Sequence, residues 1–194
     1  MSKVKILLYC TKGKPYLWQE RDENNNKLNN FLTSNIFGKI VNFLNGKIVA
    51  ECECEKVEEI HIIIEKTFGE EIKYYIYDED LENFYREDCV EKETCLKCNE
   101  ISNYLNKGRG YFLHLSNVKV FDKPLSFDKD YIYKDYKTNS VLTKAPQNMC
   151  NVYDRFGNKY ILISVQPQHL VNILNGKKTI EIRKSILNLL KEIM

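Results

Sequence analysis

The stretch ISVQPQHLVNILNGKKTIEIRK, residues 163–184, holds the densest set of structural signals in the chain. Its opening apolar run is typical of a buried strand, and Pro167 favours the first turn of a helix. Asn175-Gly176 predicts the end of that helix, because glycine readily adopts the left-handed conformation of a helix C-cap. Alternation of apolar and polar residues over 179–182 then predicts a second, short strand. The segment is therefore expected to fold as strand, helix and strand.

The short strand is expected to have one polar face. Alternate residues of a strand share a face, so Thr179, Glu181 and Arg183 are predicted to point one way, with Ile180 and Ile182 in the core. A hydroxyl, a carboxylate and a cation on one wall suit a polar ligand or the edge of a nucleobase. The same pattern is also that of a solvated edge strand with a surface ion pair. Spacing alone does not decide between these two interpretations.

Strand-forming runs dominate the rest of the chain, with helical stretches between them. Strands are predicted at residues 4–10, 48–57, 60–64, 72–77, 110–121 and 160–165, and helices at residues 80–87, 94–106, 168–174 and 186–194. No repeat and no interdomain linker is evident, so we expect a single domain over residues 1–194. Residues 20–45 and 126–159 are loop-rich excursions, and residues 185–194 form a closing helix. The pattern predicts an α+β fold, a mixed β-barrel with peripheral helices.

Composition limits the class of protein. The 194 residues are 43% hydrophobic and 29% charged, as in an ordinary globular domain. The N-terminus does not resemble a signal peptide, and no apolar run reaches the ~18 residues of a membrane helix, so we expect a soluble, cytoplasmic protein without a membrane partner. The net charge of +2 provides no strong field for DNA, but a local basic patch is enough for RNA.

The cysteines give no disulfide or metal framework. Their number, seven, is odd, which is typical of reduced thiols rather than of a secreted scaffold. Cys89, Cys95 and Cys98 form the pattern C-x5-C-x2-C, yet a second pair at zinc spacing is absent. We therefore expect no metal and no cofactor.

The segment quoted first resembles the opening of ASCH proteins in the PUA-like group, where a strand, a helix and a G-K-K-T-x-E-x-R turn form one wall of a cleft. Weaker similarities to phage and clostridial members of that family lie at residues 9–13, 44–51, 110–124 and 145–150. In the family the G-K-K-T segment comes first and leads directly into the Y-C-T-K-G strand. Here it comes last, so the order looks circularly permuted, whether naturally or by engineering.

The resemblance implies a module that binds RNA or a modified nucleoside in a cleft beside residues 176–184. The residues expected to line this cleft are Tyr9, Thr11, Lys12, Lys14, Ser164, Gln166, Lys178, Thr179, Glu181 and Arg183. Independently, Lys12 and Lys14 with Tyr9 interleave cations and aromatics, a pattern suited to phosphate contact and base stacking, although ordinary turn lysines give it too.

Two alternatives stay open. The first is a small hydrolase, of the ribonuclease or nucleoside amidohydrolase type, that uses Lys178 and Glu181 as catalytic residues. The threonine that the amidohydrolase type carries beyond its K-T pair is replaced here by Glu181. The second is a phage-type protein, located in the host cytoplasm, that binds and inhibits a host protein or defence complex. The sequence does not predict an oligomeric state.

Overall fold

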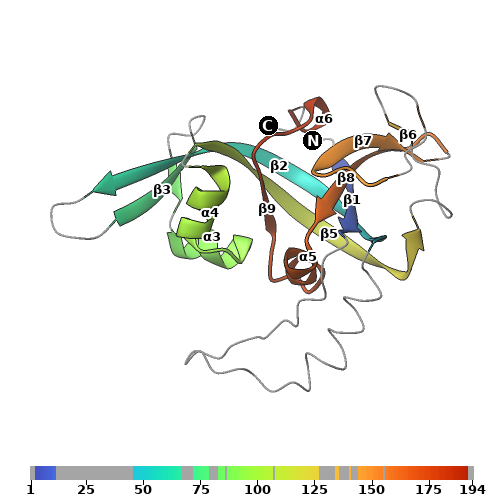
Figure 1. Cartoon of the computed structure of the whole chain (residues 1–194), viewed down its shortest axis with the longest axis horizontal. Coiled ribbons are helices and arrows are strands. Elements are labelled where there is room, and N and C mark those ends of the chain that lie inside the picture. The colour runs from blue at the N-terminus through green and yellow to red at the C-terminus, as the bar shows by residue number, and fades with distance from the viewer. Residues whose placement is uncertain are drawn as a thin grey trace, which may run out of the picture. The chain divides into compact units, whose positions relative to one another are not determined.

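The fold of this chain is described by a computed structural model covering residues 3–11, 46–66, 72–78, 83–85, 87–106, 108–126, 134–135, 140, 144–154 and 156–191 (Figure 1). The strands of this part are β1 (Val4–Cys10), β2 (Lys47–Lys66), β3 (Ile72–Asp78), β4 (Asn83–Tyr85), β5 (Arg109–Ser126), β6 (Lys134–Asp135), β7 (Met149–Tyr153), β8 (Lys159–Val165) and β9 (Ile180–Arg183). The helices are α3 (Glu87–Thr94), α4 (Cys98–Leu105), α5 (Pro167–Leu174) and α6 (Asn188–Lys191). None of the helices described is long and apolar enough to cross a membrane.

The predicted α+β class is confirmed, whereas a closed barrel is not seen. The described strands hydrogen-bond in the order β4-β3-β2-β1-β8-β7-β6, with β5 on β2 and β9 on β5. A barrel closes only when its end strands pair with each other. In this order the end strands, β4 and β6, have no such pairing within the described part of the chain, so the sheet is open.

Several predicted boundaries are wrong. The helix predicted over residues 94–106 begins at Cys98, and residues 87–94 form a separate helix, α3. Residues 48–57 and 60–64 belong to one strand, β2. Glu58, which lies between the two predicted strands, is buried against Lys56 of β2 and His114 of β5 and does not break the strand. Strand β5 continues past Pro124, as proline is tolerated where its missing N–H has no ladder partner. Residues 83–85 form a strand paired with β3, not a helix, because pairing overrides local propensity.

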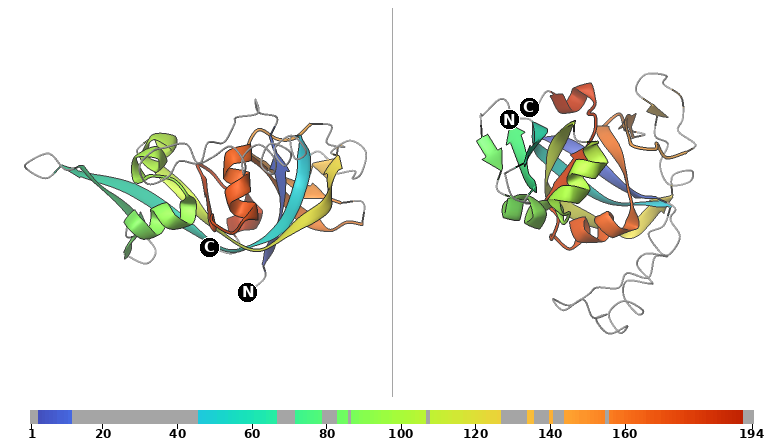
Figure 2. Two further views of the ribbon diagram at one scale, coloured as in Figure 1. Left: turned by 90° about the horizontal axis from the view of Figure 1, so that it is seen from below. Right: turned by 60° about the vertical axis from the view of Figure 1, so that its left-hand side comes forward.

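Contacts divide the chain into two compact groups of residues. Unit 1 comprises Met1–Ile6, Cys52–Val118 and Asn172–Met194, and unit 2 comprises Leu7–Glu51 and Lys119–Val171. Strands β2 and β5, the two long strands that run side by side in Figure 2, contribute residues to both units. The segment over residues 163–184 also belongs to both units. Its residues 163–171 lie in unit 2, and its residues 172–184 lie in unit 1.

Unit 1 has a core between its strands and the helices α3 and α4. Its buried residues are Ile60, Val90, Ile101, Leu105, Phe112, Ile180 and Ile182. Helix α3 packs against α4, β3 and β9, and the green helices beside β9 can be followed in Figure 1. The predicted core positions Ile180 and Ile182 are thereby confirmed. Leu190 of α6 is also fully buried within the chain itself, so this short helix docks on its own fold.

Unit 2 has a separate apolar cluster around β1, β7 and β8. Leu7, Tyr9, Ile48, Val152 and Leu162 are its buried members. Strands β7 and β8 form an antiparallel hairpin in the register Met149↔Ile163 to Tyr153↔Lys159. The predicted strand at 160–165 is thus confirmed as β8, and it pairs with β1 as well as with β7.

Candidate functional site

A tight turn after α5 sets the position of the short strand β9. Gly176 adopts a φ of 74° and donates its N–H to Ile173 O at 3.1 Å, which ends the helix as the sequence predicts. The amide of Lys178 then donates back to Asn172 O at 2.9 Å. The turn therefore folds Lys178 back toward the helix that precedes it.

Thr179 fixes the turn to the rest of unit 1 through its backbone. Its N–H donates to Glu93 O of α3 at 2.9 Å, and its carbonyl accepts the N–H of Leu115 of β5 at 2.8 Å. From there β9 runs antiparallel to β5, with Glu181 opposite Leu113 and Arg183 opposite Tyr111. These contacts hold both charged residues of β9 in a defined register.

Lys178, Glu181 and Arg183 form a buried charge cluster. Lys178 Nζ lies 3.0 Å from Glu181 Oε2, and Arg183 Nη2 lies 2.8 Å from Glu181 Oε1. Only 2%, 9% and 7% of these three side chains is exposed. Glu181 and Arg183 of the predicted polar face are therefore buried, whereas Thr179 is exposed. The ion pair of Glu181 and Arg183 is not the surface pair of a solvated edge strand, and ligand binding by this face stays a prediction. The cause of the burial is the pairing itself, because a carboxylate with two cationic partners can be buried where an unpaired one cannot.

An aromatic ring and a further cation lie at the surface beside this cluster. Tyr104, on α4, is 41% exposed, and Lys184 Nζ lies 5.1 Å from the centroid of its ring. Partial burial raises the pKa of the Tyr104 hydroxyl above its ordinary value, with a lowering influence from Arg183 and a raising one from Glu181. The tyrosine is thus electrostatically coupled to the buried cluster.

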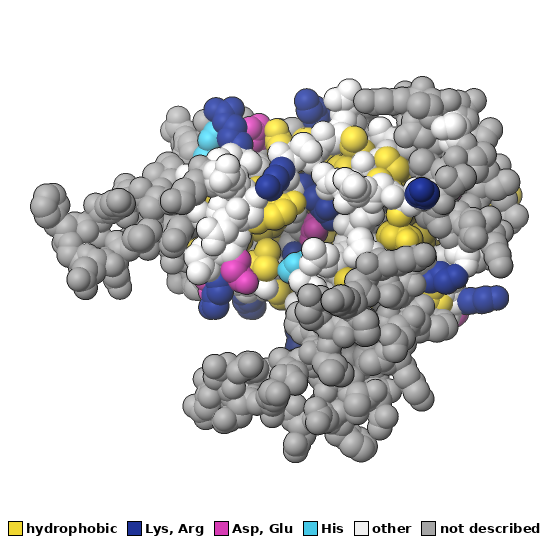
Figure 3. Space-filling view, in the orientation of Figure 1, with side chains coloured by type: hydrophobic (Ala, Val, Ile, Leu, Met, Phe, Trp, Pro, Cys, Tyr) yellow, Lys and Arg dark blue, Asp and Glu magenta, His cyan; other side chains and the backbone are white. Residues whose placement is uncertain are grey.

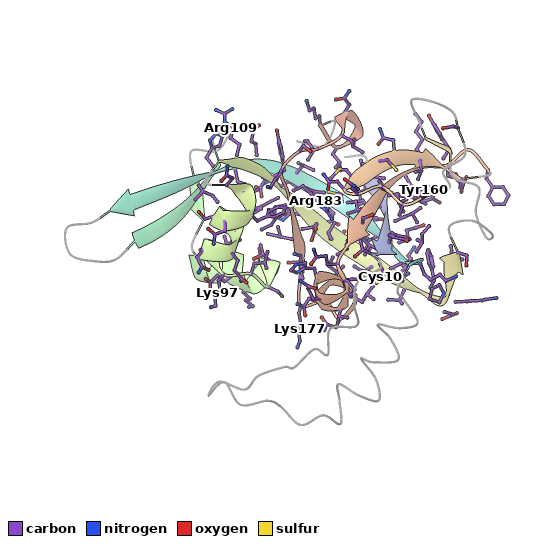
Figure 4. All side chains as sticks on the ribbon, viewed as in Figure 1. Cys10, Lys97, Arg109, Tyr160, Lys177 and Arg183 are labelled. Carbon is purple, nitrogen blue, oxygen red and sulfur yellow. The ribbon has the colours of Figure 1, made fainter. Side chains whose placement is uncertain are left out.

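The basic residues of this region differ in accessibility. Lys177 is exposed and points away from the ribbon in Figure 4, whereas its neighbour Lys178 is buried. In the same orientation, Figure 3 shows basic and acidic side chains together near the middle of the face, where Figure 4 labels Arg183, with hydrophobic side chains around them. Lys177 and Lys184 are thus accessible positive charges within the segment that carries the buried cluster.

The other predicted site residues fall elsewhere. In unit 2, Tyr9 is buried, and this burial raises its pKa. Thr11 donates its N–H to Val165 O at 3.0 Å, and the Ser164 hydroxyl donates to Pro146 O at 2.6 Å. Gln166 is exposed. Lys12 and Lys14 lie outside the described residues, so the predicted cation and aromatic pattern is not tested there.

The thiols near the cluster behave as ordinary side chains. Cys98 is buried, Cys95 is half-buried and Cys89 is exposed. Burial raises the pKa of Cys95, although Lys178 and Lys177 oppose the shift. Within the described ranges, no group of three or more acidic, histidine or cysteine side chains is arranged to hold a metal ion.

Sequence reasoning missed Tyr104 as a site residue. Tyr104 lies within the helix predicted over residues 94–106, as do Ile101 and Leu105, both of which are buried in the core. Tyr104 itself is partly exposed, as a tyrosine can be when its ring meets both the core and water. Its position beside Lys184 depends on tertiary packing and leaves no signal in the sequence.

Comparison with protein-family models, with curated proteins and with solved structures finds no match to this chain.

Proposed function

We propose that this chain binds single-stranded RNA or a modified nucleoside at the surface formed by Tyr104 and Lys184 over the buried charge cluster. The observation that carries the proposal is the partly exposed Tyr104 ring with Lys184 Nζ 5.1 Å from its centroid. An exposed aromatic beside a cation suits stacking of a base with contact to its phosphate. The resemblance of residues 163–184 to ASCH proteins supports the same ligand class.

The buried cluster would serve this surface as a fixed source of positive charge. Lys178, Glu181 and Arg183 together carry a formal charge of +1, held in place by the contacts of 3.0 and 2.8 Å. Fixed charges at low dielectric act more strongly on a nearby ligand than solvated ones. Because Lys178 is buried, we assign it this indirect role rather than direct phosphate contact.

Lys184 and the base would compete for the same ring. A base that stacks on Tyr104 can displace the ammonium group from the ring face, or take the opposite face and leave Lys184 in place. In both cases the ammonium remains beside the nucleotide, where it can neutralise a phosphate. The proposal thus requires one stacking residue and one salt-sensitive charge.

The test is fluorescence anisotropy with a labelled single-stranded RNA of about ten nucleotides over a range of salt concentrations. Stacking contributes about 1–3 kcal/mol per base, so Tyr104→Ala should weaken binding roughly 5- to 150-fold, while Tyr104→Phe should retain it. Lys184→Ala should lower the steepness of the salt dependence.

Lys177→Ala is the matched control, because it removes an exposed charge from the same segment without touching Tyr104. It should leave the stacking contribution intact. Binding that does not depend on salt, or that survives Tyr104→Ala unchanged, would contradict the proposal.

The PUA-like fold, the ASCH relationship and the permuted chain order form part of this proposal. The α+β class and the strand–helix–strand arrangement of residues 159–183 are compatible with them. The hydrolase alternative ranks second, because its two catalytic candidates, Lys178 and Glu181, are buried against each other and offer little surface to a substrate.

A further inference from the structure

A second buried carboxylate, that of Glu58 on β2, lies elsewhere in unit 1. Its side chain is 3% exposed and contacts both Lys56 Nζ and His114 Nε2. The two partners reach the solvent, since 50% of the Lys56 side chain and 30% of the His114 side chain are exposed. The group therefore joins a buried carboxylate to a histidine that water or a ligand can approach.

This arrangement orients the histidine ring through its Nε2 atom. A carboxylate that accepts a hydrogen bond from Nε2 places the ring proton on that nitrogen, so the lone pair of Nδ1 is available as a base. Lys56 Nζ contacts the same carboxylate, and a nearby cation favours the charged form of an acid. Orientation of an imidazole by a buried carboxylate is the arrangement by which enzymes position a general base.

The surroundings of the group restrict the ligand. Glu53 and Glu55 lie on the same strand, and both pair with Lys3, at 3.0 and 2.7 Å. The five charged residues Lys3, Glu53, Glu55, Lys56 and Glu58 sum to −1, which does not attract a polyanion such as RNA. The nearby thiol of Cys54 is buried, and burial raises its pKa to about 12, so it is not a nucleophile at neutral pH.

We propose that His114, positioned by Glu58, is a general base that hydrolyses uncharged carboxylic esters by activating water. His114 Nδ1 takes a proton from water, and the water oxygen bonds to the carbonyl carbon while the π pair moves to the carbonyl oxygen. When this intermediate collapses, the bond to the leaving alcohol breaks. The departing alkoxide takes the proton from His114, so the base is regenerated and no oxidant or cofactor is needed.

The first experiment measures hydrolysis of p-nitrophenyl acetate by the full chain, with free imidazole at equal concentration as the reference. General-base catalysis contributes about 10²–10⁴-fold, so we expect His114→Gln to lower kcat/KM about 100-fold. Glu58→Gln should lower kcat while KM stays constant, and Glu58→Asp should restore part of kcat, which a merely structural role would not do. Turnover no faster than free imidazole, or full activity of His114→Gln, overturns the proposal.

His61→Gln is the matched control. His61 lies on β2 and also faces a glutamate, but its Nε2 is 4.0 Å from Glu59 Oε1. Its replacement should change the rate less than twofold, and an equal loss in both variants would overturn the assignment to His114. RNA binding through Tyr104 should be unchanged in His114→Gln, so the two proposals fail separately.

A second measurement does not depend on the stability of any variant. Diethylpyrocarbonate acylates accessible imidazole nitrogens, and peptide mapping of the wild-type chain locates the product. We expect His114 to be acylated with loss of esterase activity at the same rate. A chain that loses activity without acylation of His114, or that is acylated there and keeps its activity, contradicts the proposal.

Discussion

Glu181 and Glu58, the buried carboxylates in the described part of unit 1, have similar burial but different surroundings. Each is paired with two basic side chains. The partners of Glu181 are themselves buried, with 2% and 7% of their side chains exposed, whereas those of Glu58 are 50% and 30% exposed. Water can therefore replace a partner of Glu58 but not a partner of Glu181. We infer that the exposure of the basic partners, and not only the burial of the acid, decides how much each ion pair stabilises the fold.

The largest expected effect follows from removing Glu181. In Glu181→Gln, two buried cations lose their shared counter-ion, and breaking a buried pair in this way destabilises a protein by about 3–5 kcal/mol. Denaturant unfolding at neutral pH measures the change. The double variant Glu181→Leu with Lys178→Met removes two of the three charges and should recover part of the loss. A Glu181→Gln chain as stable as the wild type would show that water reaches the cluster.

Glu58→Gln is expected to have a smaller effect. The partners released from Glu58, Lys56 and His114, are partly exposed and regain hydration, so the loss should approach that of a hydrogen bond to a charged group, about 1.5–3 kcal/mol. The same unfolding experiment compares the two variants directly. If Glu58→Gln proved as damaging as Glu181→Gln, the exposure of the partners would not be the deciding factor.

These two clusters also show what sequence reasoning can reach. The strand, helix and strand around α5 were predicted because Pro167 and Gly176 punctuate the chain at the right places. The burial of Glu181 was not predicted, because alternation identifies a face but not what covers it. The pairing of Glu58 with His114 joins residues 56 positions apart, which no local pattern encodes.

The same limit applies to strand lengths and to the candidate site. Strand β5 was expected to end at Phe121, yet it runs to Ser126 because the partner strands, not the local residues, decide where pairing stops. Tyr104 was assigned correctly to a helix, while its exposure beside Lys184 depends on how α4 packs. Local signals thus predicted element types, and tertiary contacts determined the site.

Asp154 in unit 2 extends the comparison to a buried acid whose described hydrogen bonds come from uncharged donors. Its carboxylate accepts the N–H groups of Phe156 and Asn158 at 2.8 and 2.9 Å and the Asn158 side-chain amide at 2.7 Å. Burial raises the pKa of Asp154, but these hydrogen bonds outweigh it and hold the pKa below its usual value.

Because this pKa is lower in the folded chain than in the unfolded one, the stabilisation is complete above the unfolded value. It is lost as pH falls through the folded value. We expect Asp154→Ala to lose about 1–2 kcal/mol at neutral pH and to show a shallower loss of stability in acid than the wild type. Thermal unfolding between pH 7 and pH 2 measures both. If the stability of both chains fell equally with pH, the hydrogen bonds to Asp154 would not be the source of this pH dependence.

The smallest effect is expected where both partners of an ion pair are exposed. Lys3 Nζ lies 2.7 Å from Glu55 and 3.0 Å from Glu53. The hydrogen bonds to Glu55 and Glu53 raise the pKa of Lys3, and that from Lys3 lowers the pKa of Glu55. Short distances and shifted pKa values would suggest a strong interaction, but 44% of the Lys3 side chain and 46% of the Glu55 side chain are exposed.

Exposed pairs of this kind are screened by water and salt, and the ordering of two long side chains opposes the attraction. Lys3→Gln should therefore unfold at the wild-type temperature within error, and 1 M salt should not change that result. A clear loss of stability that salt abolishes would mean that the network of Lys3, Glu53 and Glu55 acts as a unit, and geometry would then outweigh exposure in setting the strength of an ion pair in this chain.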